Sequence, residues 1–287
     1  METLHYTVAD HHFILATADA AATRLLLPSF EPFLSESVDQ PLFRFTGRAS
    51  RSLPDSAADD DFEWNGVHYK LFRTADGWAI SMQQRQRRYL LHATHNWQEI
   101  ATDLSLTDKE EAPFLNNFLS VSFSLATAPL RTLKIHASVT ERHGKALLFL
   151  GKSGTGKSTH SSLWHRYVPD CTLLNDDEPA VRIGDDGIVR VYGTPWSGKT
   201  PCYRNADAVV VAFVHLYQSP ENRLTKLCGR DAFQSLFTSS SLMRCDAVNK
   251  NNVFDNVADI LERVPAYRLD CRPDREAVAL TETLLPS

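Results

Sequence analysis

Segment 151–158 carries the most specific chemical signal in the chain. It reads Gly-Lys-Ser-Gly-Thr-Gly-Lys-Ser and matches G-x-x-x-x-G-K-[ST], the pattern of a phosphate-binding loop (P-loop). In such a loop the glycines let backbone N–H groups curl around anionic oxygens, Lys157 reaches the β- and γ-phosphates, and the Ser158 hydroxyl can bind Mg²⁺. A helix that begins there points the positive end of its dipole at the phosphates. The pattern predicts a nucleotide site, with an ordinary glycine-rich turn as the alternative.

The sequence around this segment supplies the strand and the helix that such a loop requires. The apolar run 146–150 lies between two glycines and is typical of a strand buried on both faces. Segment 158–167 contains no Gly or Pro and places Leu163, Trp164 and Tyr167 on one helical face. Strand, loop and helix therefore follow in the required order. We expect the following residues to bind the nucleotide: Gly151, Lys152, Ser153, Gly154, Thr155, Gly156, Lys157, Ser158 and Thr159.

Two neighbouring carboxylates follow the next apolar segment, in Asn175-Asp176-Asp177-Glu178. Segment 171–174 is predicted to be a strand, and carboxylates at the C-terminal end of a strand in an open parallel sheet point into the crevice where ligands bind. Adjacent side chains of a strand face roughly opposite ways. At most one of the pair is therefore expected to bind a metal ion directly, while the other acts through water or as a base. An acidic turn without a ligand is the alternative.

Length and composition are those of an ordinary globular protein. The chain has 287 residues, of which 43% are apolar and 23% are charged, and its formal net charge is −5. This charge gives no sign of a nucleic-acid-binding or membrane-binding surface, so neither partner is expected. Segment 1–15 lacks the basic and apolar regions of a signal peptide, and no apolar stretch approaches the ~20 residues of a membrane span. We expect a cytoplasmic protein.

Cysteines and the acidic triplet 59–61 are not predicted to form metal sites or cross-links. The cysteines are odd in number and widely spaced, with no C-x-x-C, which argues against a disulfide framework and a structural zinc site. The triplet Asp59-Asp60-Asp61 precedes a strand within a Ser/Asp/Pro-rich segment and is interpreted as a solvated loop. The cysteines are Cys171, Cys202, Cys228, Cys245 and Cys271.

The first third of the chain is predicted to be rich in β-structure. Its short aromatic and β-branched segments are separated by turn signals at Asn65-Gly66 and Asp76-Gly77. An aromatic stripe at helical spacing then predicts a helix over 108–128. The expected strand-forming segments are 5–16, 41–47, 62–72, 77–81 and 88–93.

After Pro129 the pattern changes to alternating strands and helices. We therefore place a domain boundary there, with a β-rich (α+β) domain over 1–129 that recognises a partner or an acceptor, and a nucleotide-binding α/β domain over 130–287. Besides the strand and helix around the P-loop, we expect strands over 134–139, 171–174, 188–192, 208–217 and 266–269, and helices over 230–242 and 253–263.

This combination resembles the HPr kinase/phosphorylase family and its fold relative, the ATP-dependent phosphoenolpyruvate carboxykinases. Segment 153–159, Ser-Gly-Thr-Gly-Lys-Ser-Thr, is similar to the S-G-T-G-K-T-T of the carboxykinases and the S-G-x-G-K-S of the HPr kinases. Segment 174–178 followed by 185–187 resembles the carboxykinase G-D-D-E stretch and its acidic hairpin. Both families also have a functional histidine about fifteen residues before the loop, where this chain has His136. The resemblance implies a P-loop-containing, carboxykinase-like mixed sheet flanked by helices.

The resemblance also implies roles for individual residues. His136 would be a metal ligand, as in carboxykinases, or a neighbour of the catalytic aspartates, as in HPr kinases. With ATP and Mg²⁺ as cofactors, Ser158 and Asp176 would hold the metal ion. Lys157 would neutralise the departing γ-phosphoryl group, and Asp177, oriented by His136, would accept the proton of the attacking hydroxyl. HPr kinases assemble, which makes a homo-oligomer possible.

Two departures from these families shape the expected function. The chain is about half the length of a carboxykinase and lacks its upstream substrate-binding motifs, so decarboxylation is the least favoured activity. In place of the glycine-rich signature of HPr kinases stands segment 192–205, where Lys199 and Arg204 are interpreted as an acceptor- or phosphate-binding element. A purely structural loop is the alternative interpretation of this segment.

The function expected from the sequence is an ATP/Mg²⁺-dependent phosphotransferase resembling HPr serine kinase/phosphorylase. It would transfer the γ-phosphoryl group to a hydroxyl, serine above all, of a peptide, protein or small molecule. The alternative is a nucleotide-binding regulatory module whose occupancy or hydrolysis gates a partner.

Overall fold

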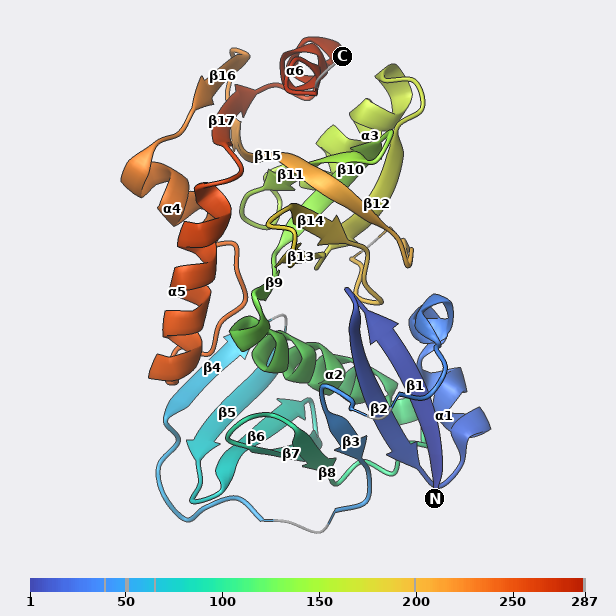
Figure 1. The fold of residues 1–287 in the computed structure, drawn as a ribbon. Helices are drawn as coiled ribbons and strands as arrows, with labels where there is room; N and C mark the ends of the chain where they lie inside the picture. Colours follow the sequence, from blue (N-terminus) through green and yellow to red (C-terminus); the bar gives the residue numbers. More distant parts are fainter. Residues whose placement is uncertain (39, 50–51, 65, 199, 286–287) are drawn as a thin grey trace. The chain divides into compact units, whose positions relative to one another are not determined.

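The computed structural model describes residues 1–38, 40–49, 52–64, 66–198 and 200–285. They form two compact units (Figure 1). The first unit comprises Met1–Pro129 together with Met243–Asn249, and the second comprises Leu130–Leu242 and Lys250–Ser287. Segment 151–158 therefore lies within the second unit. Among the described residues, no helix has both the length and the apolar character that crossing a membrane requires.

The first unit is built on an eight-stranded mixed sheet in the order β1-β2-β3-β8-β7-β6-β5-β4. β3 pairs in parallel with β2 and β8, and the other pairs are antiparallel. The elements are β1 (Glu2–Val8), β2 (His11–Thr17), α1 (Ala20–Leu26), β3 (Arg44–Thr46), β4 (Asp60–Trp64), β5 (Val67–Arg73), β6 (Gly77–Gln84), β7 (Arg87–Thr94), β8 (Glu99–Thr102) and α2 (Ala112–Thr127), with 3₁₀ turns at Pro28–Phe33, Lys109–Glu111 and Ala128–Leu130.

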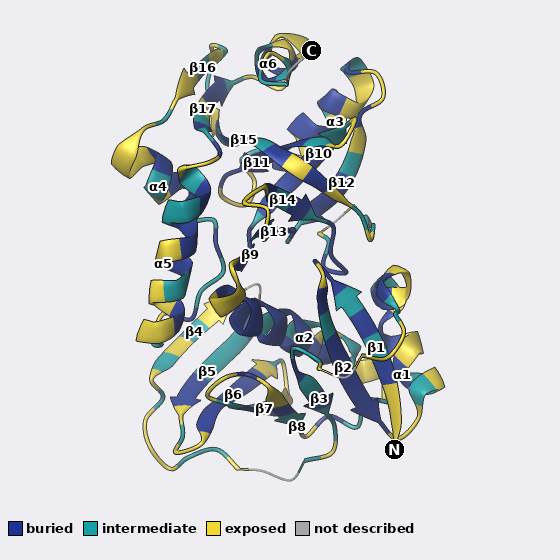
Figure 2. Ribbon diagram, viewed as in Figure 1, coloured by how far each residue is buried: buried dark blue, intermediate teal, exposed yellow. Residues whose placement is uncertain are grey.

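The aromatic stripe of α2 packs against the first sheet. Phe114 makes an edge contact with Tyr89 of β7, and Phe123 makes one with Phe13 of β2. Figure 2 shows the buried face of this helix in dark blue. The helix expected over 108–128 is thus an α-helix from Ala112 to Thr127, and its apolar face forms core.

The segment 5–16, expected to be extended, is a hairpin of β1 and β2. Its turn is formed by Ala9 and Asp10, whose φ values are 50° and 60°. Two consecutive positive φ values characterise the tight turns that connect antiparallel strands, and Asn-Gly or Asp-Gly is the usual sequence there. Ala-Asp carries no such signal, so the turn could not be read from the sequence.

The second unit is built on a nine-stranded mixed sheet. Its main path runs β12-β10-β11-β15-β14-β13-β9, and β17 pairs with both β15 and β16. The pairs β11–β15 and β15–β17 are parallel, and the others are antiparallel. The expected α/β class with a mixed sheet is therefore what the structure shows. The strands are β9 (Thr132–Lys134), β10 (Ala137–Arg142), β11 (Lys145–Leu150), β12 (Thr172–Asp177), β13 (Ala180–Ile183), β14 (Val189–Tyr192), β15 (Asp207–Gln218), β16 (Arg223–Lys226) and β17 (Ala266–Cys271).

Helices α3 and α6 pack against this sheet and enclose a core with β11, β15 and β17. Trp164 of α3 is 1% exposed, lies against Phe149 of β11, and donates its indole N–H to Thr281 Oγ1 of α6 at 2.8 Å. Val278 of α6 and Leu216 of β15 belong to the same cluster. This core fixes α3, and with it the loop that precedes α3. The helices are α3 (Lys157–Tyr167), α4 (Gly229–Phe237), α5 (Ala247–Leu261) and α6 (Arg275–Glu282).

The single strand expected over 134–139 is wrong. β9 ends at Lys134 and β10 begins at Ala137, with Ile135 and His136 between them. These two strands lie near opposite ends of the sheet path, as do β12 and β13, which are also separated by two residues. Two residues can connect strands at opposite ends of the path only if the sheet curls and its ends approach each other. We call these two connections the crossings. The two crossings run side by side, because Ile135 N donates to Pro179 O at 3.0 Å.

Candidate functional site

The loop between β11 and α3 depends on glycine at three positions. Gly151, Gly154 and Gly156 have φ values of 145°, 83° and 104°, a region that favours glycine. A Cβ on Gly151 would also lie 2.6 Å from Thr155 Oγ1, whereas a Cβ on Gly154 or Gly156 would meet nothing within 4 Å. Gly154 and Gly156 are thus needed for the backbone conformation itself. Strand, loop and helix follow in the expected order, with α3 beginning at Lys157.

Hydrogen bonds inside the loop and from β15 set its shape. The backbone N and the hydroxyl of Thr155 both donate to Lys152 O, at 3.2 and 2.8 Å. On the opposite side, Gln218 Nε2 at the end of β15 donates to Gly154 O at 3.3 Å. The loop is therefore anchored to the neighbouring parallel strand as well as to β11. Ser153 and Thr159 are exposed, as are Lys152 and Ser158.

The hydroxyl of Ser158 meets the carboxylate of Asp176. β10 is antiparallel to both β11 and β12, so those two strands run in the same direction and end at the same edge of the sheet. Ser158, in the first turn of α3, donates through Oγ to Asp176 Oδ1 at 3.0 Å, and Asp176 is 5% exposed. A carboxylate beside a hydroxyl at the start of a helix offers the hard oxygen ligands that Mg²⁺ prefers.

This donor set fits Mg²⁺ better than a metal that needs a complete protein cage. Across the described ranges, no three His, Cys, Asp or Glu side chains come together in a way that could hold a metal ion. Mg²⁺ is bound through one or two protein oxygens and completes its shell with waters and substrate phosphates. The Ser158–Asp176 pair at the mouth of the loop has this character.

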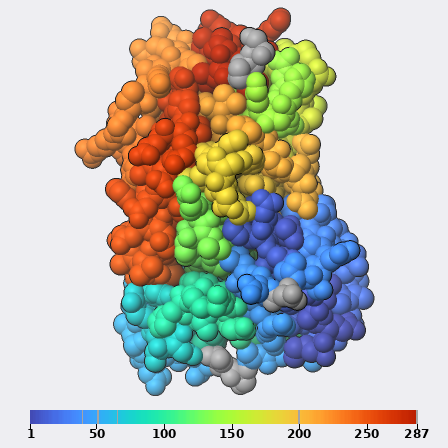
Figure 3. Space-filling model, viewed as in Figure 1, coloured from blue at the N-terminus to red at the C-terminus, as the bar shows by residue number. Residues whose placement is uncertain are grey.

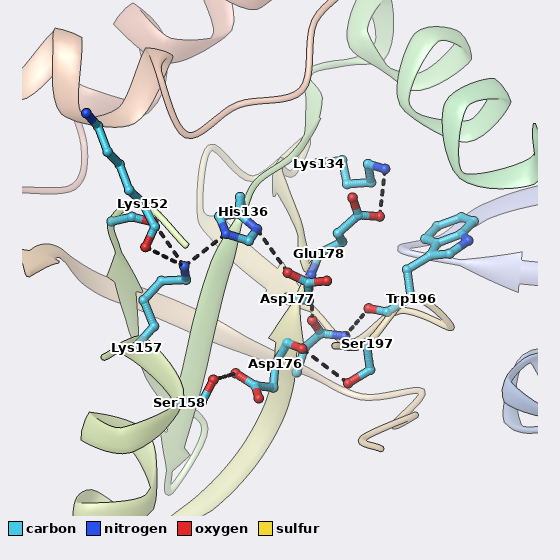
Figure 4. Close-up of polar contacts among 12 residues, drawn as sticks. Lys134, His136, Lys152, Lys157, Ser158, Asp176, Asp177, Glu178, Trp196 and Ser197 are labelled. Atoms are coloured by element: carbon cyan, nitrogen blue, oxygen red, sulfur yellow. Dashed lines mark hydrogen bonds and ion pairs between the residues drawn. The ribbon is translucent and has the colours of Figure 1, made fainter. Parts of the chain in front are cut away.

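Asp177, His136 and Lys157 form a continuous polar chain (Figure 4). His136 Nδ1 lies 2.9 Å from Asp177 Oδ1, and His136 Nε2 lies 2.9 Å from Lys157 Nζ. An ammonium at Nζ donates to Nε2, so the ring proton resides on Nδ1 and is donated to Asp177. The histidine thus connects the carboxylate on β12 to the lysine of the loop.

Lys157 folds back over its own loop. Its Nζ donates to Gly151 O at 2.9 Å, and the residue is 9% exposed. Burial lowers the pKa of Lys157, and the nearby carboxylates of Asp177 and Asp176 oppose that effect. The Lys157 ammonium is therefore hydrogen-bonded to a backbone carbonyl and a histidine nitrogen, which are acceptors that a phosphate oxygen could replace.

The curled sheet explains why His136 reaches Asp177. Asp177 pairs with Ala137, the residue directly after His136, at the end of the β10–β12 ladder. His136 directly precedes β10, and Asp177 is the last residue of β12, so both lie at the two-residue connections to β9 and β13. Asp177 has a φ of 150°, and the backbone N of Gly198 donates to Asp176 O at 2.6 Å. A Cβ on Gly198 would approach Asp176 O to 3.1 Å, so the loop 194–198 lies tightly against the aspartate pair.

Asn175 and the Lys134–Glu178 pair support the acidic segment, and sequence reasoning gave them no role. Asn175 is fully buried, donates through Nδ2 to Trp196 O at 3.1 Å, and accepts the backbone N–H of Glu178 at 3.1 Å. Lys134 Nζ lies 2.8 Å from Glu178 Oε2, and the lysine side chain is 5% exposed. No local motif marks these residues, because their partners belong to different strands.

The structure does not bring Arg204 to the carboxylate pair. Its guanidinium donates to Thr172 Oγ1 at 2.8 Å and to Leu173 O at 3.0 Å, at the beginning of β12, whereas the aspartates lie at the end of that strand. Lys199, the other residue expected to bind acceptor or phosphate, lies outside the described residues. The aspartate pair, His136, Lys157 and Ser158 are therefore the predicted site residues that meet beside the loop.

Matches to known proteins were found among solved structures alone. No protein-family model matches the chain, and no curated protein matches it. Among solved structures, the Hpr(Ser) kinase/phosphatase from Coxiella burnetii aligns over 53% of this chain and 87% of its own, with 14% identity and a TM-score of 0.31.

Proposed function

We propose that this protein is an ATP- and Mg²⁺-dependent phosphotransferase that transfers the γ-phosphoryl group to a hydroxyl, serine above all, of a peptide, protein or small molecule. The observation that carries the proposal is the meeting of two pairs at one edge of the sheet. Ser158 with Asp176 suits the donor side, and Asp177 with His136 suits the acceptor side. In this proposal residues 130–287 form an HPr kinase-like, carboxykinase-like nucleotide domain, and residues 1–129 recognise the acceptor.

On the donor side, the loop amides and the start of α3 would receive the β- and γ-phosphates of ATP. Ser158 Oγ and Asp176 would hold Mg²⁺. When bound there, the ion would neutralise charge on the phosphate oxygens. Asp176 is buried and already accepts a hydrogen bond from Ser158, so both oxygens are held close together before any ligand arrives.

On the acceptor side, Asp177 would accept the proton of the attacking hydroxyl. The hydroxyl oxygen forms a bond to the γ-phosphorus, the bond from that phosphorus to the β,γ-bridging oxygen breaks, and ADP leaves with the electron pair. The N–H at Nδ1 of His136 would orient the carboxylate and stabilise its charge before the transfer. Asp177 is suited to meet a substrate because its side chain is 38% exposed.

Lys157 would act by moving from protein acceptors to phosphate. In the structure its ammonium donates to His136 Nε2 and to Gly151 O. Phosphate oxygens carry full negative charge and make stronger charge-assisted hydrogen bonds than a carbonyl or a neutral imidazole. A bound triphosphate would therefore draw the ammonium onto itself and leave His136 to serve Asp177.

The proposal is tested in two steps on the full-length protein. Melting temperature is first measured with increasing ATP in the presence and absence of Mg²⁺, because a ligand that binds the native state raises stability. Transfer of ³²P from [γ-³²P]ATP is then screened over serine-containing peptides, proteins and small hydroxyl compounds. Stabilisation together with a labelled acceptor supports the phosphotransferase. Stabilisation without transfer to any acceptor favours a nucleotide-binding regulatory module, and no stabilisation by any nucleotide contradicts both functions.

A further inference from the structure

The end of β15 lies directly against the phosphate loop. Gln218 Nε2 donates to Gly154 O at 3.3 Å, and Leu216 O lies 3.4 Å from the position that a Cβ on Gly151 would take. Tyr217 stands between these two contact points. Alternation along the strand places Tyr217 on the face opposite to Leu216, which is buried in the core beneath α3. Tyr217 therefore lies outside that core, and the residue is 42% exposed.

Tyr217 belongs to a stack of flat groups on β15 and β17. The ring of His215 stacks on that of Tyr217 with centroids 5.0 Å apart, and the Arg268 guanidinium lies 4.2 Å from the Tyr217 ring centroid. His215 is held by Ser235 of α4 through a 2.8 Å hydrogen bond to Nδ1. Burial lowers the pKa of His215, as do the nearby charges of Lys157 and Arg268. The stack thus extends from His215 to Arg268.

The edge of the Arg268 guanidinium is already engaged. Nε and Nη2 donate to Asp270 Oδ1 at 3.0 and 2.6 Å, and the Asp270 side chain is 12% exposed. The charge of Arg268 is therefore largely compensated, which makes the group a poor site for a second phosphate. One face of the guanidinium lies over the Tyr217 ring, and the Arg268 side chain is 44% exposed, so the opposite face is the one on which a further flat group could stack.

We propose that Tyr217 and Arg268 form a stacking platform for the base of the nucleotide whose phosphates the loop binds. This inference rests on the proposed function, because it names the residues that hold the base of the phosphoryl donor. Stacking on an aromatic ring or a guanidinium plane uses the face that every base offers, and it discriminates weakly between bases. Because Asp270 occupies the hydrogen-bonding edge of Arg268, we expect ATP and GTP to bind with dissociation constants within about threefold of each other.

The test separates the base from the phosphates. Dissociation constants of Mg·ATP and of Mg·tripolyphosphate are measured by isothermal titration calorimetry with the wild type, Tyr217→Ala and Arg268→Lys. Arg268→Lys keeps the charge but removes the planar face. Each variant is expected to weaken ATP binding about tenfold, in the range of stacking contributions, and to change tripolyphosphate binding less than twofold. Tyr217→Phe, which keeps the ring, is the matched control and should bind ATP like the wild type.

The outcomes distinguish this inference from the proposed function. Wild type that binds ATP and tripolyphosphate with equal affinity, or variants that bind ATP normally, would overturn the platform while leaving the phosphate site intact. Equal weakening of both ligands would also overturn it, because the substitution would then act on the loop. Wild type that binds neither ligand would overturn the proposed function together with the platform. Melting temperatures identify any variant that fails to fold. If Tyr217→Ala fails to fold, the exposed substitution Arg268→Lys alone tests the platform.

Discussion

The Oγ atom of Ser158 lies 3.0 Å from Oδ1 of Asp176, although 18 positions separate these residues in the sequence. The contact follows from strand direction, because β11 and β12 run the same way on either side of β10. Ser158 follows the loop after β11, and Asp176 lies near the end of β12. The sheet edge thus brings together two oxygen atoms that neither segment could place there alone.

Substitution of this pair is expected to raise the concentration of Mg²⁺ needed for nucleotide binding. Asp176→Asn removes the charge and Ser158→Ala removes the hydroxyl. Each should raise the half-saturating Mg²⁺ concentration at least about tenfold, since even indirect support of a metal site is worth 10–100-fold. The measurement is ATP-dependent stabilisation during a Mg²⁺ titration. Ser162→Ala, one turn further along α3, is the control, because Ser162 Oγ donates to the backbone oxygen of Ser158. An unchanged Mg²⁺ requirement in Asp176→Asn would rule out this ligand assignment.

Asp177→Asn is expected to reduce the turnover of phosphoryl transfer by about 10²–10⁴-fold, the usual contribution of a general base. The dissociation constant for Mg·ATP should change less than threefold, because Asp177 contacts His136 and leaves the Ser158–Asp176 pair intact. Turnover and ATP affinity are measured separately, with any acceptor that the labelling screen identifies.

His136→Gln provides the companion measurement, because it removes the group that orients the carboxylate but leaves the base in place. We expect a smaller fall in turnover, about tenfold, with KM for the acceptor nearly unchanged. If Asp177→Asn transferred phosphoryl groups at the wild-type rate, the base would have to be another residue.

The parts of this fold that could be predicted from the sequence are those with local signals. Glycine spacing and an apolar run before it predicted the strand, loop and helix around Gly151, and the aromatic stripe predicted α2. Helix α6 also had a readable signal, since Asp274 accepts the Ala277 backbone N–H at 3.1 Å as an N-cap, but no helix was predicted there. The α/β class of the second unit followed from the alternation of such segments.

The arrangement around the aspartates depends on contacts that are distant in sequence. His136 was expected within a strand, whereas it lies in a crossing that exists because the sheet curls. Asn175 and Lys134 act through partners on other strands, and Arg204 returns to the beginning of β12 because the chain runs back there before β15. Nothing in the local sequence records these pairings. The sequence therefore predicts the residues of a site more readily than the residues that hold them in position.

Stability is expected to depend on pH through His160 of α3. This side chain is 3% exposed, lies against Phe149, and approaches Thr281 Oγ1 at 3.3 Å. Burial lowers the pKa of His160 from 6.5 to about 4. Between these values the unfolded chain binds a proton that the native protein excludes, so stability is complete above pH 6.5 and falls as the pH falls toward 4.

The His160 contribution is measured by urea unfolding at pH 7.5 and pH 5. From the shift in pKa, His160 should account for about 2 kcal/mol of the loss of unfolding free energy between these pH values. In His160→Gln, which does not titrate, the loss should be smaller by that amount. An equal loss in both proteins would show that the imidazole is protonated in the native state.

The central claim is that the loop after β11 binds the triphosphate of a nucleotide with Mg²⁺ and Lys157. Isothermal titration of the full-length protein with a non-hydrolysable ATP analogue, in the presence and absence of Mg²⁺, tests this most directly. The account predicts saturable one-site binding that requires Mg²⁺ and weakens at least about a hundredfold in Lys157→Ala, the range seen when one charge-stabilising donor is removed from a reacting site. Absence of binding by the folded wild type, or equal affinity in Lys157→Ala, would contradict it.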